Sequence, residues 1–119
     1  MSDERDMSAN ALPPGMLFRS RAPLRLGLAG GGTDVSPFCD LHGGYVLNAT
    51  IDLYAYASVE LLELPTIVFE AADHEIRFEG PADGRQAVDD RLALHRGVYD
   101  RIVRDFCAGN PFGVKLITH

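Results

Sequence analysis

The chain has 119 residues, of which 46% are hydrophobic and 24% charged, and its formal net charge is −6. This composition is typical of one small globular domain and excludes a disordered or collagen-like chain. The acidic balance argues against nucleic-acid binding, and no apolar run approaches the length of a membrane span. The first six residues carry three acids and one arginine, unlike a secretory leader, so we expect a cytoplasmic protein whose cysteines stay reduced.

Charge is distributed unevenly along the chain. Arg19, Arg21 and Arg25 lie in a segment with only two acids, residues 19–51, whereas residues 52–105 carry six bases and twelve acids. A locally basic segment in an acidic chain favours a small anionic ligand near its arginines. The histidines and cysteines show no short ligand spacing, so the sequence gives no support for a metal site.

The first elements surround a glycine triplet. Residues 1–15 end in Leu-Pro-Pro-Gly and are interpreted as a mobile tail, so the folded part is expected over residues 16–119. Residues 16–30 alternate in part and predict a strand that ends in the turn Gly30-Gly31-Gly32. Thr33 or Asp34 is then expected to cap a short helix that reaches His42.

Several strands are predicted after Gly43-Gly44, which end that helix. Residues 45–51 and 53–62 each predict a strand, because they are rich in residues that suit a pleated sheet. Residues 66–71 and 74–79 flank Ala72-Asp73 and predict a hairpin.

The clearest helix is predicted over residues 85–107, followed by a strand over residues 113–118. Apolar side chains and one histidine recur in the helix at steps of three and four: Val88, Leu92, His95, Tyr99, Ile102, Val103 and Phe106. A domain rarely stops on a bare strand whose covering element is missing, so we expect the chain to be an N-terminal fragment.

Chemistry is most strongly indicated between Arg21 and Asp34. Glycines after a strand let a backbone approach a ligand closely, and Asp34 could accept hydrogen bonds from two sugar hydroxyls. A plain alternative stays open, in which the triplet is a tight turn, Asp34 a helix cap and Arg25 a solvated residue. The triplet does not fit the dinucleotide-binding fingerprint, because Val35 occupies the position of its third glycine.

The stretch RAPLRLGLAGGGTDVSPFCDLHGGYVLNATIDLYAY resembles the N-terminal signature of the sugar kinases in the GHMP superfamily. Within that superfamily the similarity is closest to the D-glycero-D-manno-heptose 7-phosphate kinases. The resemblance implies a mixed α/β (α+β) domain of the ribosomal protein S5 domain 2-like type, present here incompletely. It also implies ATP-dependent phosphorylation of a sugar or sugar phosphate, with Mg²⁺, by a full-length parent.

The resemblance assigns roles to individual residues. Arg25 matches the strand arginine placed near the transferred phosphoryl group, and is the expected catalytic residue. Gly31, Gly32 and Thr33 match the turn that lines the sugar pocket, and Asp34 matches the carboxylate that holds sugar hydroxyls.

The family's second motif, a P-x-x-x-G-L-G-S-S-S-like loop around the ATP phosphates, is absent from the sequence. It is expected beyond His119, together with the other nucleotide-binding and Mg²⁺-binding residues. The fragment alone is therefore expected to be inactive and to self-associate. Two alternatives stay open: a non-catalytic interaction module or remnant, and a fucokinase-like or octose-kinase-like enzyme.

Five further side chains are assigned structural roles. Tyr54 and Tyr56, two residues apart on one strand, are expected to pack rather than to bind nucleotide. His95 is expected to be a satisfied histidine in the interior or at its boundary rather than a ligand. Asp100 and Arg104 are expected to form an i,i+4 ion pair on the solvated face of the helix.

Overall fold

The computed structural model describes residues 12–84 and 88–119. Its residues divide into two compact units, one formed by Arg21–Ala55 and the other by Tyr56–His119 with the start of the chain up to Ser20. The units are called here the hairpin unit and the core unit, and each is described by itself. Among the described residues, no helix is both long enough and apolar enough to cross a bilayer.

The strands form one mixed sheet in the order β1-β2-β5-β3-β4. Their bounds are β1 Leu17–Ala29, β2 Leu47–Leu61, β3 Thr66–Ala71, β4 Ile76–Pro81 and β5 Val114–Thr118. β5 pairs antiparallel with β2 and parallel with β3, so the last strand of the chain lies inside the sheet rather than at its edge. The expected combination of a mixed sheet with helices, an α+β fold, is confirmed.

The predicted hairpin after residue 65 is present in the core unit. β3 and β4 pair antiparallel, with Phe69 opposite Phe78. The connection is the single 3-10 turn Ala72–His74 followed by Glu75, whose φ of 54° places it in the left-handed region. A two-residue turn of type I′ would require such backbone angles at two positions and one of type II′ at one, and the residues between these strands include no glycine.

The predicted long helix begins later than its apolar periodicity suggests. A 3-10 turn covers Asp90–Leu92 and α2 covers Ala93–Phe106, while residues 85–87 lie outside the described part of the chain. Asp89 precedes the turn, and its carboxylate accepts a hydrogen bond from the backbone N–H of Arg91 at 2.9 Å. This side-chain cap satisfies a backbone donor that has no partner within the turn, and the helical conformation therefore starts here.

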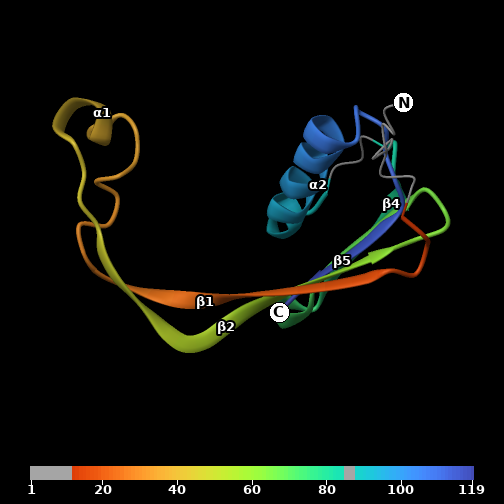
Figure 1. The fold of residues 1–119 in the computed structure, drawn as a ribbon, viewed down its shortest axis with the longest axis horizontal. Coiled ribbons are helices and arrows are strands. Elements are labelled where there is room, and N and C mark those ends of the chain that lie inside the picture. The colour runs from red at the N-terminus through yellow and green to blue at the C-terminus, as the bar shows by residue number, and fades with distance from the viewer. Residues whose placement is uncertain (1–11, 85–87) are drawn as a thin grey trace, which may run out of the picture. The chain divides into compact units, whose positions relative to one another are not determined.

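The core lies between α2 and the sheet, and Figure 1 shows α2 against one face of β3, β4 and β5. Phe69 and Ile67 of β3 and Leu92 at the start of the helix are fully buried. The ring of Tyr99 approaches that of Phe69 edge-on, with 5.9 Å between the centroids. Ile102 and Phe106, which the periodicity placed on the same stripe, are exposed, whereas Val103 in the last turn of α2 is partly buried against the core.

His95 lies in this core and is 6% exposed. Its Nε2 is 2.9 Å from the hydroxyl of Thr118 on β5, whereas its Nδ1 has no hydrogen-bond partner among the described residues. The expected histidine at the core is therefore present, with one of its two nitrogens satisfied.

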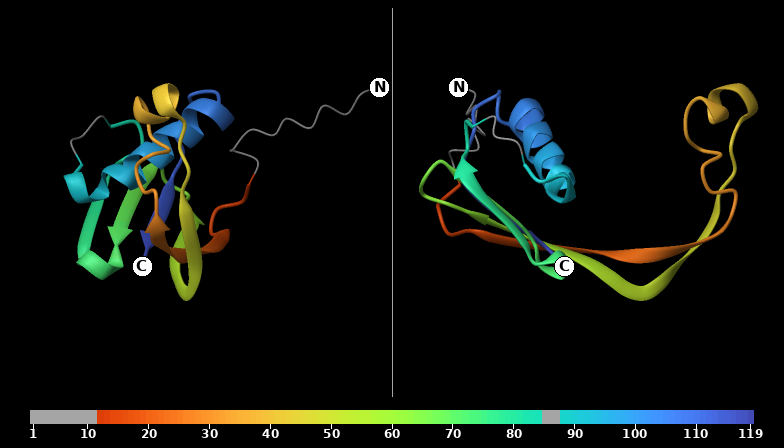
Figure 2. Two further views of the ribbon diagram at one scale, coloured as in Figure 1. Left: turned by 90° about the vertical axis from the view of Figure 1, so that its left-hand side faces the viewer. Right: turned by 180° about the vertical axis from the view of Figure 1, so that it is seen from behind.

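The hairpin unit contains β1 from Arg21 onward, β2 as far as Ala55, and the loop that joins the two strands. β2 is one continuous strand of 15 residues, so the prediction of two strands separated at Asp52 was wrong. Nothing at Asp52 breaks the backbone pairing, because the residue is neither Gly nor Pro. Both views in Figure 2 show the short helix α1, Phe38–His42, carried on the loop between the two strands.

Candidate functional site

The loop between β1 and β2 contains four of the five residues that the sequence assigned to a site. Gly30 begins it with a φ of 76°, and a Cβ atom there would lie 1.9 Å from the carbonyl oxygen of Tyr45. Only glycine therefore allows the two ends of the loop to come this close. Gly31 and Gly32, by contrast, have no atom within 4 Å of an added Cβ, and both are exposed. Their bare backbone is open to a ligand.

Thr33 joins the two ends of this loop. Its hydroxyl accepts a hydrogen bond from the backbone N–H of Tyr45 at 3.1 Å. The single hydroxyl proton faces two carbonyl oxygens, that of Gly30 at 2.7 Å and that of Tyr45 at 3.0 Å. Gly44 lies against the same point, where an added Cβ would be 2.1 Å from the carbonyl oxygen of Thr33. The Thr33 side chain is thus engaged within the loop and positions its neighbours.

The expected helix cap at Thr33 or Asp34 was wrong. Turns occupy residues 31–37, α1 begins at Phe38, and the residue before it, Pro37, forms no side-chain cap. The Thr33 hydroxyl is not available to cap the helix, because it contacts the backbone of Tyr45 across the loop. The end of α1 was predicted correctly, since Gly43, with a φ of 69°, donates its N–H to the carbonyl oxygen of Cys39 at 3.0 Å.

Asp34 is exposed and follows Thr33 directly. Its carboxylate forms no hydrogen bond or ion pair with any residue that the structure describes, in contrast to Asp40 of α1, which binds the Ser36 hydroxyl. A carboxylate that caps no helix and pairs with no cation keeps its acceptor sites for a ligand. The Thr33 contacts fix the backbone from which this carboxylate projects.

Arg25 lies on β1, outside the loop. It is exposed, and within the described chain no hydrogen bond or ion pair joins it to Gly31, Gly32, Thr33 or Asp34. With a rise of about 3.3 Å per residue, it lies roughly 13 Å along the strand from Ala29. The structure therefore gathers the four loop residues and leaves Arg25 on the strand that leads to them.

One arrangement at this strand was missed by the sequence analysis. The guanidinium carbon of Arg21 lies 4.8 Å from the ring centroid of Tyr54, and that of Arg19 lies 5.0 Å from the centroid of Tyr56. The expectation that the tyrosines pack is met by these cation–π contacts. The signal was present as two arginines and two tyrosines, each pair spaced by two residues, but the pairing of the strands was needed to match them.

The ion pairs on α2 differ in detail from the prediction. Asp100 pairs with Arg96, with an Nε–Oδ1 distance of 3.0 Å, whereas Arg104 pairs with its neighbour Asp105 at 2.8 Å. The predicted Asp100–Arg104 pair was therefore wrong, because Asp100 binds Arg96 and Arg104 binds Asp105 instead. Hydrogen bonds from Arg104, and then from Arg101, lower the pKa of the Asp105 carboxyl below its usual value.

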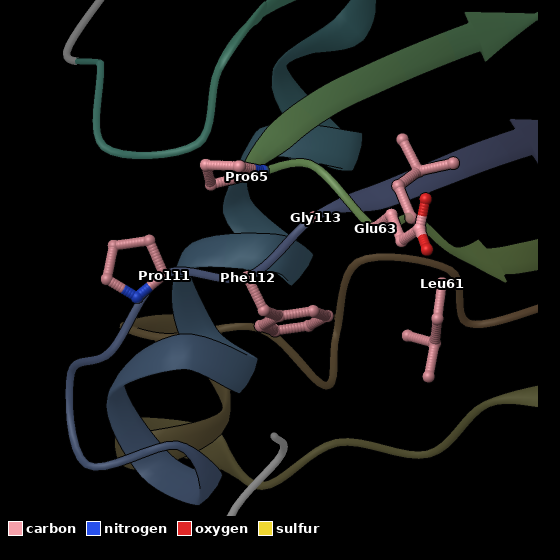
Figure 3. A pocket seen from close by; sticks show the side chains of 7 residues that line it. Leu61, Glu63, Pro65, Pro111, Phe112 and Gly113 are labelled. Atoms are coloured by element: carbon pink, nitrogen blue, oxygen red, sulfur yellow. The ribbon is translucent and has the colours of Figure 1, made fainter. Parts of the chain in front are cut away.

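A pocket of about 150 Å³ lies in the core unit (Figure 3). Phe112 and Pro65 contribute apolar surface and Glu63 a carboxylate. Gly113 is required beside it, since an added Cβ would lie 1.9 Å from the carbonyl oxygen of Leu64. The hydroxyl of Tyr99 donates to the Phe112 carbonyl at 2.9 Å and so fixes one wall. None of the residues assigned to a site lines this pocket.

Acidic, histidine and cysteine side chains do not cluster in the described part of the chain. In residues 12–84 and 88–119, no group of three or more His, Cys, Asp or Glu side chains is placed to hold a metal ion.

The relatives of the chain are sugar kinases. No family model matches the chain. A D-glycero-α-D-manno-heptose 7-phosphate kinase from Campylobacter jejuni is 43% identical over 102 residues, which cover 86% of this chain and 30% of that protein. The curated relative is thus about three times as long as the region that it shares with this chain.

Three solved structures share the fold. A D-glycero-D-manno-heptose 1-phosphate kinase from Bacteroides thetaiotaomicron matches 87% of this chain and 33% of its own, with a TM-score of 0.73 and 43% identity. A sugar kinase from Campylobacter jejuni has the same coverage, a TM-score of 0.68 and 39% identity. The galactokinase of Lactococcus lactis, solved with galactose, has a TM-score of 0.60 and 20% identity over 86% of this chain and 26% of its own, which supports the fold alone.

These matches confirm the relationship expected from the segment between Arg19 and Tyr56. They also agree with the mixed sheet and helices of the fold. The chain is therefore similar in sequence and in fold to heptose phosphate kinases and spans about a third of the length of these relatives.

Proposed function

We propose that the chain is the sugar-facing part of an ATP-dependent kinase that phosphorylates a heptose monophosphate, with heptose 7-phosphate as the first choice. One observation carries the proposal: Asp34 has no hydrogen-bond or ion-pair partner in residues 12–84 and 88–119, and it projects from a loop that Thr33 holds closed. The identity of 43% to a kinase named for heptose 7-phosphate supports the choice of sugar. Because ATP is the expected phosphoryl donor, we place the reaction in the cytoplasm.

The roles in this proposal follow from the positions of the side chains. Asp34 accepts hydrogen bonds from sugar hydroxyls, which exist before the reaction and hold the substrate in place. The open backbone of Gly31 and Gly32 lies beside the sugar, and Thr33 keeps the loop in shape. Arg25 acts on the transferred phosphoryl group, whose charge shifts during a transfer that depends mainly on positioning and electrostatics.

The 119 residues contain no Gly/Ser-rich phosphate loop, which would supply most backbone contacts to a triphosphate. We therefore expect the isolated chain to show no ATP turnover and no measurable affinity for Mg-ATP. Isothermal titration of the chain with Mg-ATP checks this expectation. Binding in the micromolar range would contradict it and would point to a nucleotide site within these residues.

The function is tested with a chimera in which residues 1–119 are joined to the part of the Campylobacter jejuni kinase that follows the matched region. Production of ADP is measured with heptose 7-phosphate, heptose 1-phosphate, galactose and no sugar. We expect ADP production that depends on a heptose monophosphate and exceeds the rate without sugar. A chimera that folds cooperatively but produces ADP equally with all four would contradict the proposal. The same chimera carrying Asp34→Ala is the matched control.

A further inference from the structure

The arginines of this chain fall into two groups that differ in their partners. Each described arginine between residues 77 and 104 lies within 4.0 Å of a carboxylate oxygen: Arg77, Arg91, Arg96, Arg101 and Arg104. The three arginines of β1, by contrast, have no ion pair with a carboxylate of the described residues. In an acidic protein, cations that remain unpaired are available to an anion from solution.

Arg21 has no carboxylate partner among the described residues, and an aromatic ring holds it in place. Its guanidinium lies over the ring of Tyr54 on the neighbouring strand β2. The guanidinium carbon is 4.8 Å from the ring centroid. A guanidinium that stacks on an aromatic ring leaves the N–H donors at its edge free, and these donors match the oxygens of a phosphate. The ring also restricts the side chain, which lowers the conformational entropy lost on binding.

Arg21 and Arg25 share one face of β1, because residues four apart on a strand point to the same side. Their Cα atoms are about 13 Å apart by the rise of an extended chain. Two arginine side chains and a ligand between them can span such a distance. Arg21 and Arg25 can therefore hold two phosphoryl groups of one reaction complex. Asp52 lies two residues before Tyr54 on the same face of β2 and pairs with neither arginine among the described residues.

We propose that Arg21, supported by Tyr54, binds a second phosphoryl group beside the one that Arg25 acts on. This inference rests on the proposed function, because it makes the strand face the binding site for a phosphorylated sugar or for its nucleotide partner. The carboxylate of Asp52 repels an anion and so lowers the affinity of this face. Only an anion that accepts hydrogen bonds from the protein on both sides is therefore bound well. Arg21 is thereby a binding residue for phosphate, distinct from the loop that holds the sugar hydroxyls.

The test uses the 119-residue chain and inorganic phosphate at constant ionic strength. Phosphate is titrated while the Arg side-chain Nε–Hε resonances are followed by NMR. Arg21→Gln is expected to weaken phosphate binding by about tenfold, the effect of one charge-assisted hydrogen bond. Tyr54→Leu is expected to weaken it less, and Asp52→Asn to strengthen it. Arg77→Gln, which removes an exposed arginine with carboxylate partners, is the matched control and leaves binding unchanged.

Two outcomes would overturn the inference: the same phosphate affinity in the parent and in Arg21→Gln, or an equal loss in Arg77→Gln. The source of the phosphoryl group is distinguished in the chimera. A higher KM for heptose phosphate alone in Arg21→Gln assigns the group to the sugar, and a higher KM for ATP alone assigns it to the nucleotide. An active chimera in which neither KM changes rejects the inference while the proposed function stands. Phosphate binding through Arg21 with an inactive chimera rejects the proposed function only.

Discussion

The Thr33 hydroxyl and the backbone of Tyr45 are joined by a reciprocal contact, in which the hydroxyl accepts the N–H at 3.1 Å and faces the carbonyl oxygen at 3.0 Å. Twelve residues separate the two partners, so one side chain closes the loop that carries Asp34. The candidate site therefore depends on a contact between the start and the end of the loop, rather than on a helix cap.

The first prediction concerns this contact. Thr33→Val keeps the shape of the side chain but removes the hydroxyl, so the Tyr45 N–H loses its acceptor. Hydrogen exchange at the Tyr45 amide should accelerate by about fivefold or more, because such a bond contributes about 1 kcal/mol. Thr33→Ser retains the hydroxyl and is the control that should exchange like the parent. Equal exchange in the Val and Ser variants would show that the contact does not hold the loop closed.

The same contact explains one limit of the sequence analysis. Local patterns predicted the strand before Gly30, the end of α1 at Gly43 and the hairpin of β3 with β4, because each depends on residues close in the chain. Thr33 looked like a helix cap for the same local reason. Its actual partner, Tyr45, is too far along the sequence for a capping pattern to reveal.

Strand pairing accounts for the other differences. Asp52 interrupts the hydrophobic run and suggested a break, but β2 runs through it as one strand, and tertiary context often overrides strand propensity. The stacking of Arg21 on Tyr54 also requires knowledge of which residues lie opposite each other. Asp34 and Arg25 were selected by resemblance, and their roles stay predictions.

The second prediction concerns Asp89 at the start of the 3-10 turn. Hydrogen bonds from the Arg91 side chain and then from its backbone lower the pKa of Asp89 from 3.8 to about 2. A carboxyl with a lowered pKa in the folded state stabilises the fold above the unfolded value, and this contribution is lost as the pH falls from about 4 through 2. Asp89→Asn should therefore reduce the free energy of unfolding at pH 7 and have less effect near pH 2.

Urea unfolding of the parent and of Asp89→Asn at pH 7, 4 and 2 measures this difference. Asp83→Asn, an exposed acid for which the structure shows no ion pair among the described residues, is the control and should behave like the parent at all three values. A difference between the parent and Asp89→Asn that stays constant from pH 7 to pH 2 would mean that the ionised carboxylate does not stabilise the turn.

The third prediction concerns the even-numbered face of β1. Leu24, Leu26 and Leu28 are 44%, 54% and 62% exposed, and no described residue of the hairpin unit is buried. Apolar surface of this kind favours association, because contact removes it from water. We expect the 119-residue chain to self-associate as its concentration rises.

Sedimentation velocity at several concentrations measures this association. Leu26→Ser should shift the chain toward monomer, whereas Leu64→Ser, at an exposed leucine of the core unit, should change it less. A parent chain that stays monomeric throughout the concentration range would contradict the expectation.

The kinetic roles of Asp34 and Arg25 differ in the proposed function. Arg25→Ala in the chimera should mainly lower kcat, because its charge matters most while the phosphoryl group is in transfer. The KM for heptose phosphate should change less than kcat. A variant whose kcat is unchanged and whose sugar KM rises instead would assign Arg25 to ground-state binding of the sugar.

The most direct test of the account is the KM for heptose 7-phosphate of the chimera with and without Asp34→Ala, measured by a coupled ADP assay at saturating ATP. The account predicts a KM at least about tenfold higher in the variant, because a charged acceptor is lost from hydroxyls that are bound before the reaction, at roughly 1.5–3 kcal/mol each. A KM and a kcat both within about twofold of the parent, a difference well below 1 kcal/mol, would show that Asp34 does not bind the sugar.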